Sequence, residues 1–254
     1  MRKKSLFLIF NALFFLVIST KAQNNRRIVD NSIGWYALFV NHKIDNKFSL
    51  HGEFQYRRTD YINDPMQNLY RVGVNYLIHP QVTLRVGYAF ADTYPYGEIP
   101  IQSSGRRFPE HRSYQMLTIN NPIGTLQLSH RFMLEQRFIG RFLDPKANRA
   151  DDYLYMNRIR YMVRMQLPLQ GKTLDDKEPY VAVYDELLIG FGRNVNQNVF
   201  DQNRFGALLG YRFTEKIRIE GGYLNQNLQL GRFVDGNNLF QNNTGVVLNT
   251  YLNF

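Results

Sequence analysis

The sequence of 254 residues contains no cysteine, and this absence excludes a disulfide framework and any metal site built on thiolates. Its five histidines are scattered without the H-x-x-x-H or H-E-x-x-H spacing of metal ligands, so no metal or cofactor is predicted. Beyond residue 22 no apolar run approaches the ~20 residues of a helical membrane span. If the chain crosses a membrane, it must do so as a closed β-barrel, which satisfies every backbone polar group within lipid.

The first 22 residues have the layout of a secretory signal peptide. Three basic residues at positions 2–4 precede the apolar run 6–19, and Thr20 and Ala22 occupy the −3 and −1 positions of a cleavage site. An uncleaved membrane anchor is the alternative. The apolar run is short for a spanning helix and ends at small residues, so we predict a signal peptide over 1–22.

Export changes the meaning of the positive net charge. Removing residues 1–22 takes away four basic residues and no acidic one, so the formal charge falls from +10 to +6. Nucleic acid is therefore an implausible partner for the mature domain, 23–254, whereas a basic surface or lumen would still favour anions. The predicted location is the outer membrane of a Gram-negative bacterium.

Residues 47–57 (KFSLHGEFQYR) alternate apolar and polar side chains without interruption, which is typical of a strand with one apolar face and one charged face. The pattern recurs, and several runs reach the ~9–11 residues that cross a bilayer at a tilt, where a soluble strand averages ~5–6. We expect strands at 34–44, 47–58, 67–78, 81–91, 111–120, 124–137, 153–167, 179–191, 201–213, 216–227 and 243–254.

The connections between these strands alternate in length. Short turns such as Asp45-Asn46 and Thr214-Glu215 separate long polar loops near 58–66, 92–110, 138–152, 192–200 and 228–242; the connection 168–178 is longer than this rule allows. The proline-containing loop 93–110 is expected to be a stiff surface loop, and the alternatives are that it folds over the mouth or binds a ligand. Aromatic residues near both strand ends match the two belts of a membrane interface.

These observations predict an all-β fold: a transmembrane antiparallel β-barrel with long extracellular loops and mostly short periplasmic turns. A soluble periplasmic β-sandwich or binding protein is the alternative. Because the last strand ends at Phe254, the strand at 34–44 would start at the extracellular end, and residues 23–32 must then form a further strand or a plug in the lumen. We expect twelve strands, or ten if two short elements merge.

Two stretches carry a family resemblance: FPEHRSYQMLTINNPIGTLQLSHRFMLEQRF (108–138) and FDQNRFGALLGYRF (200–213). Together with Trp35, they resemble an uncharacterised family of exported outer-membrane β-barrels, domain of unknown function 2490, frequent in Bacteroidota. The resemblance implies the barrel fold and no established activity. The terminal TYLNF resembles the last-strand signal, ending in Phe254, that barrel-assembly machinery recognises, although Thr250 stands where an apolar residue is usual.

If the apolar faces contact lipid, the opposite faces line the lumen, and arginine outnumbers carboxylate there. The predicted lumen and ligand residues are Glu53, Arg71, Arg85, Arg131, Glu135, Arg137, Arg158, Arg160, Arg164, Arg204 and Glu220. Arg131 and Glu135 could pair with Arg158 or Arg160 on the next strand. Such pairs would fix the register and replace a hydrophobic core; the alternative is a constriction or binding surface for a small anionic solute.

The sequence therefore favours a narrow or occluded, anion-leaning channel or a structural barrel, with outer-membrane lipid and the assembly machinery as partners. A lipid-modifying enzyme is the alternative, but we predict no catalytic residues. Ser129 and His130 are neighbours on one strand and face opposite sides, while Glu110 and His111 at the extracellular rim are explained equally well by solvation.

Overall fold

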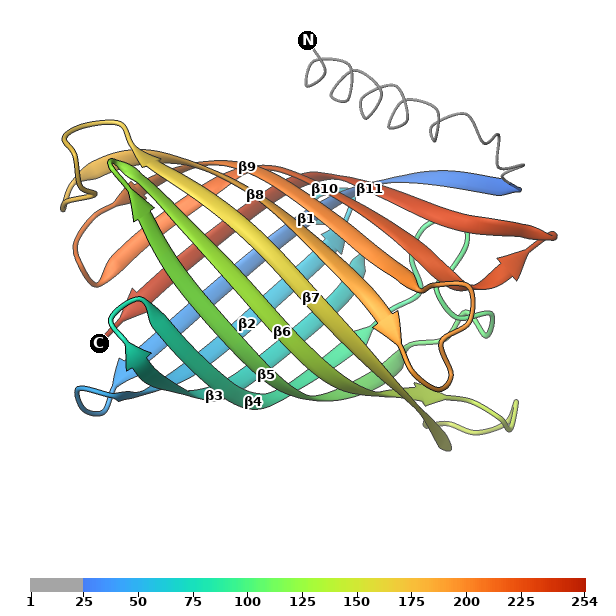
Figure 1. Ribbon diagram of the computed structural model, residues 1–254. Coiled ribbons are helices and arrows are strands. Elements are labelled where there is room, and N and C mark those ends of the chain that lie inside the picture. Colours follow the sequence, from blue (N-terminus) through green and yellow to red (C-terminus); the bar gives the residue numbers. More distant parts are fainter. Residues whose placement is uncertain (1–24) are drawn as a thin grey trace, which may run out of the picture.

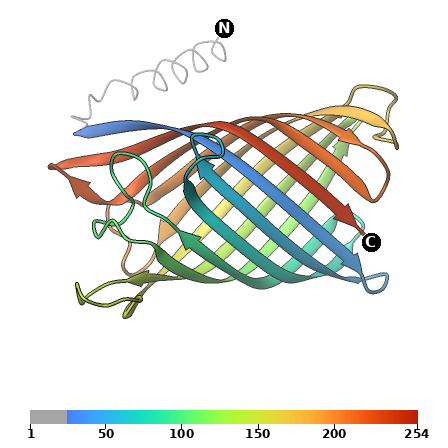
Figure 2. The same cartoon turned by 180° about the vertical axis from the view of Figure 1, so that it is seen from behind.

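The computed structural model describes residues 25–254, which form a closed barrel of eleven strands (Figures 1 and 2). The strands are β1 (Arg26–Lys43), β2 (Phe48–Thr59), β3 (Pro65–His79), β4 (Val82–Thr93), β5 (Phe108–Ile123), β6 (Leu126–Arg141), β7 (Asp152–Pro168), β8 (Glu178–Phe191), β9 (Phe200–Arg212), β10 (Ile217–Val234) and β11 (Asn237–Asn253). From residue 25 onward, the chain has no helix that is both long and apolar enough to span a bilayer. The predicted signal peptide, 1–22, lies outside the described residues.

Every strand pairs with its sequence neighbours in antiparallel register, and the predicted alternation of faces is confirmed. Outward side chains are apolar and exposed: Leu209 is 61% exposed and Val72 is 59% exposed. Inward side chains include charged groups with almost no exposure, such as Glu135 and Arg158 at 1% each. The barrel is therefore apolar outside and polar within, the reverse of a soluble protein.

The barrel closes between its first and last strands, which run parallel, from Arg26 opposite Asn238 to Asn41 opposite Asn253. Residues 26–32 are the beginning of β1, so they form neither a separate strand nor a plug, and the expected count of twelve or ten strands is wrong for the described chain. An odd number of strands places the first and last strand in the same direction, so parallel pairing closes the sheet without another element.

Two ends of the barrel differ in their connections, and we call them the loop end and the turn end. The loop end carries the connections 60–64, 94–107, 142–151 and 192–199, at the right of Figure 1. The turn end carries 44–47, 80–81, 124–125, 213–216 and the longer 169–177, together with the C-terminus.

One expected loop is a hairpin. Strand β10 runs to Val234 and β11 starts at Asn237, so most of 228–242 is paired and only Asp235 and Gly236 connect the strands. Both residues have positive φ, 51° and 75°, as a two-residue Asp-Gly hairpin turn requires. This hairpin and the start of β1 project beyond the other strands at the loop end (Figure 1).

Candidate functional site

Contacts between strands that are not neighbours in the sheet show that the charged side chains meet inside the barrel. Arg158 of β7 contacts Asp201 of β9, and Arg131 of β6 contacts Glu186 of β8. Each contact spans an intervening strand, and the residues on one face of a strand alternate with those on the other. These side chains therefore share the interior of the barrel.

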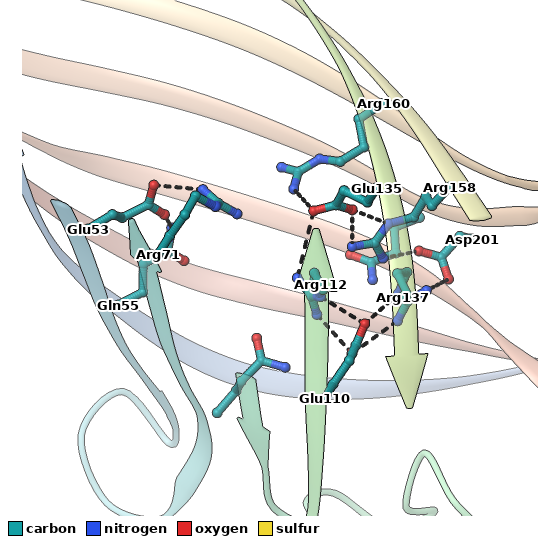
Figure 3. A network of polar contacts seen from close by, with 12 residues as sticks. Glu53, Gln55, Arg71, Glu110, Arg112, Glu135, Arg137, Arg158, Arg160 and Asp201 are labelled. Atoms are coloured by element: carbon teal, nitrogen blue, oxygen red, sulfur yellow. Dashed lines mark hydrogen bonds and ion pairs between the residues drawn. The ribbon is translucent and has the colours of Figure 1, made fainter. Parts of the chain in front are cut away.

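The centre of the interior is a network in which each carboxylate serves several guanidinium groups (Figure 3). Glu135 accepts from Arg158 at 2.6 Å and from Arg160 at 3.1 Å, and Arg112 approaches it at 3.9 Å. Arg158 also donates to Asp201 at 2.6 Å. Glu135 thus contacts both of the arginines that the sequence placed on the next strand.

Two further carboxylates extend this network. Glu186 binds Arg160 at 2.7 Å and Arg131 at 2.8 Å, with Arg204 at 3.4 Å. Glu110 holds both Arg112, at 2.7 Å, and Arg137, at 2.5 Å. Such charge-assisted pairs satisfy buried guanidinium groups that would otherwise be costly.

Two smaller clusters lie apart from the central network. Figure 3 shows the first, in which Arg71 donates to Glu53 at 2.6 Å and Gln55 donates to the same carboxylate. In the second, Arg164 pairs with Glu220 at 2.6 Å, and the hydroxyls of Tyr180 and Tyr251 donate to Glu220 at 2.9 and 2.7 Å. The predicted lumen residues are therefore inside the barrel, but they form separate groups.

Several interior arginines have no close carboxylate among the described residues, or only a long contact. Arg57 donates to the side-chain carbonyls of Gln55 and Gln67, and Arg85 donates to that of Asn75 at 2.5 Å. Arg204 donates to Gln202 at 2.7 and 3.0 Å, beside its 3.4 Å contact with Glu186. At these positions neutral amides orient the guanidinium groups without neutralising their charge.

Each end of the barrel contains a cavity of about 470 Å³. The loop-end cavity is lined by arginines that include Arg57, Arg112 and Arg204, and by the amides Gln67, Gln202 and Gln226. The turn-end cavity is lined by Lys43, Lys47, Ser49, Asn75, Arg85 and Phe254, among others. The two cavities share no lining residue, and Glu53, Arg71, Glu135 and Arg160 line neither of them. These four residues are at most 7% exposed, so their side chains pack closely in the interior.

The connection 94–107 is anchored at the mouth of the loop-end cavity, contrary to the expectation of a surface loop. The hydroxyl of Tyr96 donates to Gln241 at 2.8 Å, and Gln241 in turn donates to the backbone carbonyl of Ile99 at 2.7 Å. Burial raises the pKa of Tyr96 to about 12, so the hydroxyl remains a neutral donor. On the other side, Gln102 donates to the carbonyl of Gly140 at 2.8 Å. The connection thus crosses from β11 to β6.

The candidate catalytic pair at the rim is divided between the two faces of the barrel. Glu110 is buried in the central network, whereas His111 lies on the outer face, where its Nδ1 contacts the hydroxyl of Tyr88. His130 likewise contacts Tyr161 on the outside, at 2.9 Å. Within residues 25–254, no group of His, Asp and Glu is arranged to hold a metal ion.

Comparison with known proteins shows the family. Residues 33–237 match the family described as "Protein of unknown function (DUF2490)", and the chain belongs to it. Among solved structures, the NanC porin in its rhombohedral crystal form resembles the chain at 16% identity, covering 87% of this chain and 97% of the porin with a TM-score of 0.46. No curated protein matches the chain.

Proposed function

We propose that the protein is an outer-membrane barrel with a narrow or occluded interior that favours anions. The observation that carries this proposal is the inverted distribution of side chains: apolar and exposed outside, as at Leu209 and Val72, and guanidinium-rich within. A closed barrel whose outer wall is apolar suits lipid, because it leaves no backbone group unpaired. In this setting the loop end faces outward and the turn end, with Phe254, faces the periplasm, where assembly machinery would recognise the last strand.

The preference for anions is supported by the excess of arginine over carboxylate in the interior. Arg57 and Arg85 have no carboxylate partner in the part of the chain that the structure describes, and Arg204 has only a 3.4 Å contact. Fixed positive charge within a low-dielectric wall concentrates anions and repels cations. If the filled centre does not open, the same ion pairs serve a structural barrel.

Planar-bilayer recording of purified protein under a salt gradient tests whether anions pass through the barrel. We expect a small conductance with an anion-selective reversal potential, and Arg131→Ala should shift that potential toward cations. Arg131 is suited to this test because Glu186 keeps its 2.7 Å contact with Arg160 and remains compensated. The matched control is Arg149→Ala, an exposed arginine of the connection 142–151, which should leave selectivity unchanged. Cation preference, or no conductance from either the wild type or Arg131→Ala, would contradict the proposal that anions pass through the barrel.

A further inference from the structure

The loop-end cavity contains two nearly buried guanidinium groups, those of Arg57 and Arg204, that have no close carboxylate. A third arginine of the lining, Arg232, is less buried and donates to the backbone carbonyl of Pro100. In the central network, every other arginine has a carboxylate oxygen within 2.8 Å: Arg112, Arg131, Arg137, Arg158 and Arg160. Arg57 and Arg204 line the cavity without such a partner. Both are nearly buried, at 6% and 7% exposure. A buried cation that is not neutralised by the protein attracts a counter-charge from outside.

Neutral amides hold these two groups in place. Gln55 donates to Glu53 and accepts from Arg57, and Gln67 accepts from Arg57 at 2.8 Å. Gln202 accepts from Arg204 and also from Gln226 at 2.7 Å. The guanidinium groups are therefore oriented before a ligand arrives, which lowers the entropic cost of binding.

Both groups lie against the ring of Trp35. The Cζ atom of Arg57 is 3.9 Å from the ring centroid, and that of Arg204 is 5.1 Å from it. Trp35 is buried at 6% exposure, and within residues 25–254 its indole N–H has no hydrogen-bond partner. Trp35 does not itself line the cavity, so its ring lies behind the two guanidinium groups and is close enough to respond to a ligand that they bind.

The rest of the cavity is suited to an organic body. Its walls include the apolar side chains of Met66, Ile101, Phe108 and Leu228 beside the amides. Its volume of about 470 Å³ lies within the ~300–1,000 Å³ of small-molecule sites. A bare inorganic ion would leave these walls without contacts.

We propose that the loop-end cavity binds a small organic oxyanion, a carboxylate or a phosphate monoester, whose charged group contacts Arg57 and Arg204 beside Trp35. Guanidinium groups bind both kinds of oxyanion with paired hydrogen bonds. The site belongs to the passage proposed above and so deepens that function, but binding at it does not require conduction.

Trp35 is the only tryptophan in the sequence, so its fluorescence reports on this site in the full-length barrel in detergent. The probes are cyclohexanecarboxylate, cyclohexyl phosphate, the uncharged cyclohexanol and inorganic phosphate. We expect a saturable change with at least one of the two organic acids, and the tighter acid identifies the ligand class. Cyclohexanol and inorganic phosphate should bind at least about tenfold more weakly. Cyclohexanol has no anionic group for the two arginines, and inorganic phosphate has no organic body for the apolar walls.

Variants assign the binding to the two arginines. Arg57→Gln and Arg204→Gln should each weaken the acid at least about tenfold, and Arg57→Lys, which keeps the charge, should lose less than Arg57→Gln. The matched control is Arg218→Gln: Arg218 also stacks on an aromatic ring, Tyr251 at 4.2 Å, its buried Nε has no hydrogen-bond partner among the described residues, and it does not line the loop-end cavity.

Three results would overturn the proposal: no saturable change with either acid, an equal response to cyclohexanol, or the same loss in Arg218→Gln as in Arg57→Gln. If the protein binds the acid but carries no current in bilayers, the proposal of conduction is contradicted, whereas the proposed binding site is not. An anion-selective current without a change in Trp35 fluorescence would support conduction and contradict the binding site.

Discussion

Single carboxylates compensate several arginines inside this barrel. Glu135 lies between Arg158 and Arg160 with Arg112 nearby, and Glu186 lies between Arg131 and Arg160. Removing one carboxylate therefore leaves more than one guanidinium group without its partner. Breaking a buried pair costs far more than the pair contributes when intact, because an uncompensated charge remains.

Glu135→Gln should consequently lower the free energy of unfolding by about 3–5 kcal/mol. The amide has nearly the same shape as the carboxylate but supplies no negative charge to Arg158 and Arg160. Unfolding by guanidinium chloride in detergent, followed by Trp35 fluorescence, measures the change.

The control for this prediction is Glu98→Gln. Glu98 pairs with Arg27 at 2.8 Å, but the two side chains are 68% and 37% exposed, and such pairs contribute about 0–1 kcal/mol. Equal destabilisation by Glu98→Gln and Glu135→Gln would contradict the account of the interior network.

At the same scale, the alternation of strand faces was enough to predict which charged residues point inward, including Glu53, Arg71 and Glu135. It missed Asp201, because a bulge between β8 and β9 shifts the register at Leu188 and Ile189 and breaks the period of two. It also assigned Glu110 to the rim, whereas β5 begins at Phe108 and carries Glu110 within the barrel. If the strand had been expected to start at 108, the alternation would have placed Glu110 and Arg112 on the same inward face.

At the scale of the strands, the parallel pairing of β1 with β11 closes the barrel and so determines that it has eleven strands. Amide side chains pair across it in register: Asn31 donates to Asn243 at 2.8 Å and Asn41 donates to Asn253 at 3.1 Å. Asn242 donates to Asp30 at 2.7 Å on the outer face. These pairs bind directly opposite residues, so they favour one register over its neighbours.

All the expected strand positions are confirmed, but most strands are longer than expected, and β1, β5, β10 and β11 are longer by at least five residues. The pattern failed at 26–33, 228–234 and 237–242, where the strands project beyond the other strands at the loop end (Figure 1). The local signal for the hairpin was present in the Asp235-Gly236 dipeptide. Parallel closure left no such signal, because it depends on the directions of two strands at opposite ends of the chain.

Gly245→Ala tests this parallel pairing. Gly245 is opposite Ile33, and a Cβ at this position would overlap the backbone carbonyl of Ile33. We expect the variant to lose the compact, heat-modifiable band of the folded barrel on gel electrophoresis. Gly52→Ala is the matched control, since a Cβ at Gly52 meets nothing within 4 Å. A stable barrel from Gly245→Ala would contradict the closure between β1 and β11.

At the scale of the whole molecule, one arrangement underlies every proposal: an apolar wall around a polar interior. Ion pairs take the place of a hydrophobic core in the centre, and a cavity opens at each end. Family membership brings no activity to this arrangement, so the function follows from the distribution of charge and apolar surface.

The most direct test of this arrangement is spin-label accessibility along one strand in lipid vesicles. The sequence has no cysteine, so single-cysteine variants of residues 82–89 in β4 can be labelled one at a time. We predict an alternation of period two: oxygen, which partitions into lipid, should relax labels at Val86 and Tyr88, and a water-soluble nickel chelate should preferentially reach the label at Arg85, which lines the turn-end cavity. Labels at Val86 and Tyr88 that are reached by the chelate and not by oxygen would contradict the inside-out barrel.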